Sequence, residues 1–212
     1  MKRVVAVVLI LSAAVGLAVA TPASAGDGSS IMYSEESSYT AAPGEAVTVV
    51  IVVSDHGSLT GDGLEHVSLV ADYDPDALQA TDVEANGWFE SGDESVTVAT
   101  DTDIDADAGV VTLTQTREPA GDGTVATAPF ATITFTIDED ATGNTTVGLE
   151  ESSVTLAGGY AKALFVQPTQ DGPNGPQIQV VDGADRVPGL TAVTAVIALV
   201  LAAAVAVRRK NR

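Results

Sequence analysis

The 212-residue chain contains no cysteine, which excludes a disulfide framework, a thiolate metal site and a catalytic thiol. It has two histidines, His56 and His66, and neither lies in a metal-ligand spacing such as His-Glu-x-x-His. A nucleophile elbow, a phosphate-binding loop and a dinucleotide fingerprint are also missing. The sequence therefore predicts a protein that is not an enzyme.

Basic residues are scarce outside the two ends of the chain. Between Gly26 and Val187, three of them (Arg117, Lys162 and Arg186) stand against all 29 acidic residues, so this part has a formal charge of −26. Nucleic-acid binding requires clustered Lys and Arg and is excluded. The Debye length falls to about 3 Å in 1 M salt, which screens the repulsion between carboxylates. Because valine, leucine and isoleucine are regularly patterned, we expect a folded domain adapted to high salt.

The N-terminus has the three parts of a secretory signal. A basic Met1–Arg3 precedes the apolar segment Val4–Ala20, and Ala23-Ser24-Ala25 supplies the small residues that a signal peptidase needs. The sequence predicts a signal peptide over residues 1–25, cleaved after Ala25. The alternative is an uncleaved N-terminal membrane helix.

The C-terminus carries a second apolar segment, Leu190–Val207, followed by four basic residues. Eighteen helical residues span about 27 Å, enough to cross a thin bilayer core. Positive charge after this helix predicts a cytoplasmic tail, and therefore a domain held by its C-terminus on the extracellular face of the membrane. We expect residues 168–187 to form a linker, in which Ile178–Val181 could form a short strand, and residues 188–212 to form the anchor.

Residues 29–167 show the period of two that is typical of β-strands. Val67–Tyr73 alternates and ends at the turn Asp74-Pro75-Asp76, after which Leu78 is an apolar plug. Phe130–Ile137 alternates apolar residues with threonines, and Ala46–Val53 is apolar on both sides. No convincing amphipathic helix lies between the two ends. The sequence predicts an all-β, jelly-roll-like sandwich with a single core.

The chain resembles the signature of the cohesin domain in the strand Val67–Tyr73, the Asp-Pro corner, Leu78 and the second strand that follows. The Pro43-Gly44-Glu45 turn before a valine-rich strand and the segment Phe130–Leu156 also resemble that family. The resemblance implies a non-catalytic module that docks a dockerin-bearing partner through one sheet face. Related modules bind carbohydrate, so binding of polysaccharide or envelope glycan is the alternative, and a purely structural envelope protein is a third.

Two groups of residues are candidates for ligand binding. Trp88 lies in a loop, where an exposed ring could stack on sugar and a buried ring would join the core. Asp101, Asp103, Asp105 and Asp107 alternate in the expected tip of a hairpin and could offer oxygens to Ca²⁺. Counted as an EF-hand from Asp101, that loop has alanine and threonine where glycine and a bidentate acid are required. We therefore favour a solvated acidic loop and expect no cofactor.

Two further motifs concern export. Asn144-Thr145-Thr146 is an N-glycosylation sequon, expected in a turn of the exported domain. Pro188-Gly189-Leu190, the apolar helix and the basic tail resemble the sorting signal (PGF-CTERM) of haloarchaeal surface proteins handled by archaeosortases. Leu190 stands where that signal usually has phenylalanine. Processing would exchange the helix for a lipid, and otherwise the helix itself is the anchor.

Overall fold

The computed structural model describes residues 28–91, 95–167 and 174–181. The predicted signal peptide, the predicted sorting motif and the apolar C-terminal segment lie outside these ranges. Within them no helix is long and apolar enough to cross a membrane. The described residues form β1 (Ser29–Ser34), β2 (Ser38–Ala41), β3 (Ala46–Ser54), β4 (Leu64–Asp72), β5 (Leu78–Ala85), β6 (Thr97–Asp105), β7 (Val110–Glu118), β8 (Thr127–Ile137), β9 (Gly143–Thr146), β10 (Ser153–Leu156), β11 (Tyr160–Val166) and β12 (Gln177–Val180).

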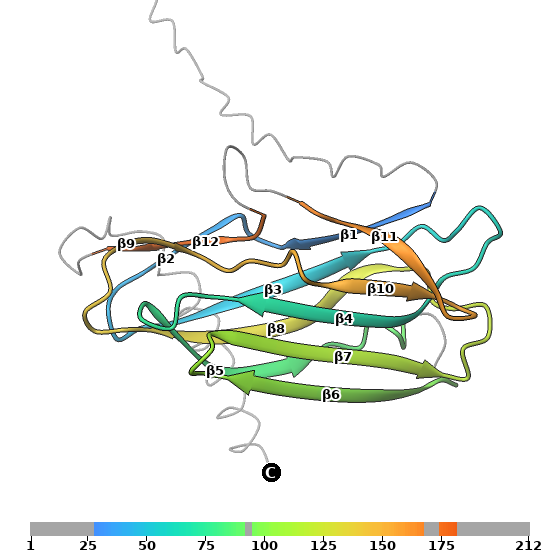
Figure 1. The fold of residues 1–212 in the computed structure, drawn as a ribbon, viewed down its shortest axis with the longest axis horizontal. Coiled ribbons are helices and arrows are strands. Elements are labelled where there is room, and N and C mark those ends of the chain that lie inside the picture. The colour runs from blue at the N-terminus through green and yellow to red at the C-terminus, as the bar shows by residue number, and fades with distance from the viewer. Residues whose placement is uncertain (1–27, 92–94, 168–173, 182–212) are drawn as a thin grey trace, which may run out of the picture.

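Nine strands form one sheet in the order β5-β8-β3-β1-β11-β10-β4-β7-β6, which folds on itself into two facing layers (Figure 1). One layer contains β5, β8, β3, β1 and β11, and the other contains β10, β4, β7 and β6. Strand β5 lies against β6 and β7, so the sheet is nearly closed. Within this sheet, all pairings are antiparallel except β1 with β11. The predicted all-β class is confirmed.

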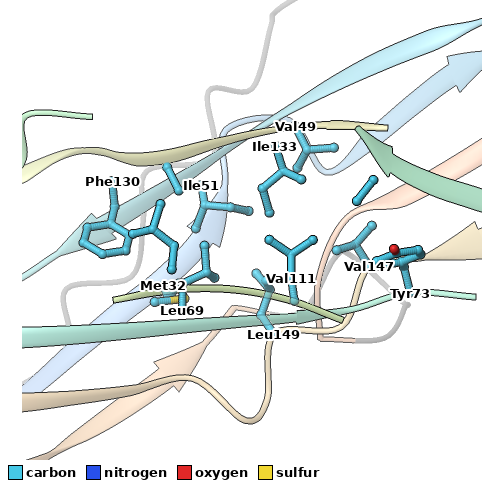
Figure 2. Packing of buried hydrophobic residues seen from close by; sticks show 14 of the residues in the cluster. Met32, Val49, Ile51, Leu69, Tyr73, Val111, Phe130, Ile133, Val147 and Leu149 are labelled. Carbon is cyan, nitrogen blue, oxygen red and sulfur yellow. The ribbon is translucent and has the colours of Figure 1, made fainter. Parts of the chain in front are cut away.

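The core fills the space between the two layers, and apolar side chains of β3 and β8 point toward those of β4 and β7 (Figure 2). On β8, Ile133, Phe135 and Ile137 are buried, whereas the threonines between them are partly exposed. Burial of apolar surface stabilises a fold by about 25 cal/mol per Å². Because the chain has no disulfide, this core is the main source of the domain's stability.

The predicted corner after β4 is present. The Asp74 carbonyl accepts hydrogen bonds from the backbone N–H groups of Ala77 and Leu78 at 3.1 and 2.9 Å, and its Oδ1 accepts one from Asp76 N–H at 3.0 Å. Leu78 is buried, as expected for an apolar plug. The acids of this corner act as turn-formers.

Three short strands, in the order β2-β12-β9, form a second sheet. Ile178 of β12 is fully buried within the core cluster, and Val181 N–H donates to the Ala41 carbonyl at 3.0 Å. The strand that the sequence allowed near residues 178–181 therefore belongs to the domain. The predicted boundary at residue 167 lies too early.

The acidic hairpin differs from the expected long loop. Strand β6 continues to Asp105, and only residues 106–109 form the turn before β7. Gly109 has a positive φ of 69°, and a Cβ there would lie 2.2 Å from the Tyr73 carbonyl oxygen. A run of aspartates is typical of a loop. An edge strand can also carry them, because one row of its side chains faces water.

Candidate docking faces

The outer side of the β10–β4–β7–β6 layer is rich in hydroxyl groups. In register across these strands, one row contains Ser153, Ser68, Thr114 and Asp101, and the next contains Thr155, His66, Thr116 and Ala99. His66 Nδ1 lies 2.8 Å from Thr116 Oγ1. We call the outward residues of these four strands the hydroxyl face. Its short polar side chains give a flat surface with hydrogen-bonding groups.

Three aspartates border the hydroxyl face on edge strand β6. Asp101, Asp103 and Asp105 are all exposed and pair with outward residues of β7. Alternate residues of a strand repeat at about 6.8 Å, so their carboxylates cannot converge on one ion. Asp107 lies in the turn beyond them. Among the described residues there is no group of three acidic or histidine side chains placed to hold a metal, and the calcium site considered from the sequence is not supported.

Trp88 does not offer its ring to a sugar. Its side chain is fully buried, its Nε1–H donates to the Val53 carbonyl at 2.9 Å, and its ring packs edge-on against Phe89 with centroids 4.9 Å apart. Tyr73 and Phe89 are also buried. Trp88 is therefore a core residue, and the stacking role considered for it is not supported.

A buried ion pair joins the end of β3 to β11. Lys162 Nζ lies 2.5 Å from Asp55 Oδ1, with side-chain exposures of 2% and 0%. Asp55 also accepts hydrogen bonds from Ser30 Oγ at 2.6 Å and from Gly57 N–H at 2.9 Å, while Lys162 also donates to the Gly57 carbonyl at 2.8 Å. Sequence reasoning missed this pair. The available signal was the alternation of Lys162 with Leu164, which puts both on the inner side of β11.

Asp72, at the end of β4, lies in a cluster of acids. Burial raises the pKa of its carboxyl above the ordinary value, and the negative charges of Glu151 and Glu150 raise it further. The Asp72 backbone pairs with Gly148, where a Cβ would lie 2.8 Å from Asp72 Oδ2. A glycine at this position leaves room for the carboxylates of Asp72 and Glu150.

Asn144 lies in β9, whereas the sequence placed it in a turn. It pairs with Gln179 of β12, and its side chain is exposed. Its use as a glycosylation site stays a prediction.

On the other layer, edge strand β5 carries the exposed Asp82 and Glu84, which pair with Thr134 and Thr132 of β8, and the remaining four strands have a different chemistry. Strands β1, β3, β8 and β11 contain no acidic residue. Phe165 of β11 is 60% exposed. We call the outward residues of these four strands the neutral face.

The fold and sequence match known proteins of one family. The cohesin domain model matches residues 36–170. A sixth cohesin of a scaffoldin from Acetivibrio cellulolyticus, solved in complex with a dockerin, is 14% identical, with a TM-score of 0.54 over 73% of this chain and 99% of that one. A type I cohesin from Clostridium thermocellum, also in a dockerin complex, is 14% identical, with a TM-score of 0.53 over 73% and 100% of the two chains.

A scaffoldin cohesin from Pseudobacteroides cellulosolvens is 16% identical, with a TM-score of 0.54 over 77% of this chain and 97% of that one. At these identities the solved structures establish the fold. No curated protein sequence matches significantly. The family model covers more than half of the chain, and this protein belongs to the cohesin family of non-catalytic binding modules.

Proposed function

We propose that this protein docks a dockerin-bearing partner outside the cell through its hydroxyl face. Family membership carries this proposal, since solved cohesins with the same fold are found in complex with dockerins. The glycan-binding alternative depended on an exposed Trp88, and that side chain is buried.

The chemistry of the hydroxyl face supports it as the docking surface. Its central strands β4 and β7 present Ser68, Thr112, Thr114 and Thr116 as partly exposed hydroxyl groups. Hydroxyl groups both donate and accept hydrogen bonds, and their small size allows a partner to approach the sheet closely. The bordering aspartates of β6 would attract basic residues on the partner and thereby set its orientation.

Anchoring on the extracellular face is the second part of the proposal. It is supported by Leu190–Val207, which has the length and composition of a membrane span, and by the basic residues that follow it. Haloarchaeal sorting through Pro188-Gly189-Leu190 would replace this span with a lipid. Mass spectrometry of the mature C-terminus distinguishes the two forms, since retention of Arg212 excludes processing.

Docking is tested with a panel of purified dockerin domains and the full chain in nonionic detergent and molar KCl. We compare Thr114→Tyr on the hydroxyl face with Thr134→Tyr on the neutral face, because both threonines are partly exposed on central strands. Titration calorimetry should show at least one dockerin binding the unmodified chain, at least tenfold weaker binding to Thr114→Tyr, and unchanged binding to Thr134→Tyr. Equal affinities for both variants would place the interface elsewhere, and no binding by any dockerin would contradict the proposed function.

A further inference from the structure

Four neighbouring strands of this acidic protein carry no acid. Strands β11, β1, β3 and β8 are consecutive in the sheet and together contain 33 residues. At the chain-wide frequency of 29 acidic residues in 212, a segment of that length would carry about four or five. Their only charged residue is Lys162, which is buried against Asp55. The outer side of these strands is therefore uncharged.

The neutral face also carries apolar side chains that lie outside the main core cluster. In register across the strands, Phe165 pairs with Ile31, and Tyr33 pairs with Val52, which pairs with Pro129. Ile31 and Val52 are only 8% and 7% exposed, yet both lie outside the core cluster. The face therefore combines apolar residues with the threonines of β3 and β8.

The rest of the described surface repels a second copy of the same molecule. The described ranges contain two Lys or Arg residues, Arg117 and Lys162, and both are buried. Every acidic residue in those ranges except Asp55 is at least partly exposed. Two copies that approach through other acid-bearing surfaces bring carboxylates together, whereas the acids next to the neutral face, Asp82 and Glu84, lie on β5 at its edge.

We propose that the neutral face is a self-association surface, on which a second copy of this chain packs by two-fold symmetry. A two-fold contact places the same patch on both partners, so a charge-free patch avoids self-repulsion. The 33 residues of these strands, each rising about 3.3 Å on strands about 4.8 Å apart, give roughly 500 Å² per partner, the size of a weak or transient interface. This area is sufficient for a modest dimer.

Self-association through this face has a consequence for docking. The hydroxyl face lies on the opposite layer of the sandwich (Figure 1). A dimer joined by its neutral faces therefore directs two hydroxyl faces outward. The self-association proposal needs no dockerin, and its failure would leave the docking proposal intact.

Cysteine cross-linking tests the proposal cleanly, because the chain has no cysteine of its own. Thr48→Cys and Ala163→Cys introduce exposed thiols on the neutral face, and Thr112→Cys introduces a partly exposed thiol on the hydroxyl face. The full chain in nonionic detergent and molar KCl is treated with a short bis-maleimide. We expect a covalent dimer from the neutral-face variants and only monomer from Thr112→Cys.

Sedimentation equilibrium of Phe165→Asp supplies an independent measurement. Because Phe165 is 60% exposed, its replacement should leave the melting temperature nearly unchanged. The new carboxylates should weaken dimerisation at least tenfold, whereas Thr112→Asp should not change it. This pair also controls for association through the apolar C-terminal segment, which both variants retain.

Three results would overturn the proposal. The first is a monomeric chain at all salt concentrations, and the second is a dimer that Phe165→Asp does not weaken. The third is a monomer in which the thiol of Ala163→Cys is protected from maleimide, which would mean that the chain's own remaining segments cover the face. Lowering the salt should dissociate a genuine dimer, since the Debye length rises from about 3 Å at 1 M to about 10 Å at 0.1 M.

Discussion

Replacing Lys162 with methionine removes the cation from the buried ion pair while keeping a long apolar side chain in β11. Asp55 would then remain fully buried, with Ser30 Oγ–H and Gly57 N–H as its remaining hydrogen-bond donors. Breaking a buried pair by removing one partner costs about 3–5 kcal/mol. Because two donors remain, we expect Lys162→Met to lower the free energy of unfolding by about 3 kcal/mol, the lower end of that range.

Native domains are stable by about 5–15 kcal/mol, so this loss is a large fraction of the total. For a domain of roughly 150 residues, each kcal/mol shifts the melting temperature by about 2–4 °C. Lys162→Met should therefore melt about 6–12 °C below the unmodified chain. The double variant with Asp55→Ala removes the stranded carboxylate as well, and should be less destabilised than the sum of the two single variants.

The assay is thermal unfolding followed by circular dichroism, at one fixed molar KCl concentration for all variants. Asp101→Asn serves as the control for removing one charge from an exposed site, and it should change the melting temperature by less than about 2 °C. A Lys162→Met variant that melts within 2 °C or so of the unmodified chain would refute the reasoning, as would full additivity in the double-mutant cycle.

Three further predictions concern single positions. Gly109→Ala should destabilise the domain by about 2 kcal/mol more than Gly44→Ala, as measured by chemical denaturation. Both glycines have positive φ, but only at Gly109 would an added Cβ lie 2.2 Å from a backbone atom. Equal losses of stability would contradict this prediction. Trp88→Phe should lower the free energy of unfolding by about 1–3 kcal/mol, because the hydrogen bond from the indole N–H to the Val53 carbonyl is lost. An unchanged stability would contradict this prediction. Asp72→Asn should stabilise the domain at neutral pH, because the raised pKa of Asp72 means that its charged form is disfavoured in the fold, and the gain should vanish as the pH falls through that pKa. If the difference in stability between Asp72→Asn and the unmodified chain is the same at pH 7 and at acidic pH, this prediction is contradicted.

The strands buried on one side were predictable from the sequence. In Val67–Tyr73 and Phe130–Ile137 the inner residues are apolar and the outer ones mostly polar, so a period of two identifies both the strand and its buried side. The Asp-Pro corner was predictable because proline and aspartate favour that turn locally. These patterns depend on neighbouring residues alone.

The features that were missed depend on contacts distant in sequence. The residues of β6 after Thr100 resemble a loop, and only pairing with β7 makes them a strand. Ile178 is buried because β12 lies between β2 and β9, which its own short segment cannot indicate. Trp88 could be placed in or out of the core only once the Val53 carbonyl was found to lie within reach of its indole N–H.

Protection of single thiols by a bound dockerin is the most direct test of the claim that this cohesin docks through its hydroxyl face. Thr114→Cys and Thr134→Cys, each in the otherwise cysteine-free chain, are labelled with maleimide with and without a saturating dockerin domain. We predict that the dockerin slows labelling of Thr114→Cys at least tenfold and leaves Thr134→Cys unchanged. Protection of Thr134→Cys alone would contradict the account, because it would assign docking to the neutral face.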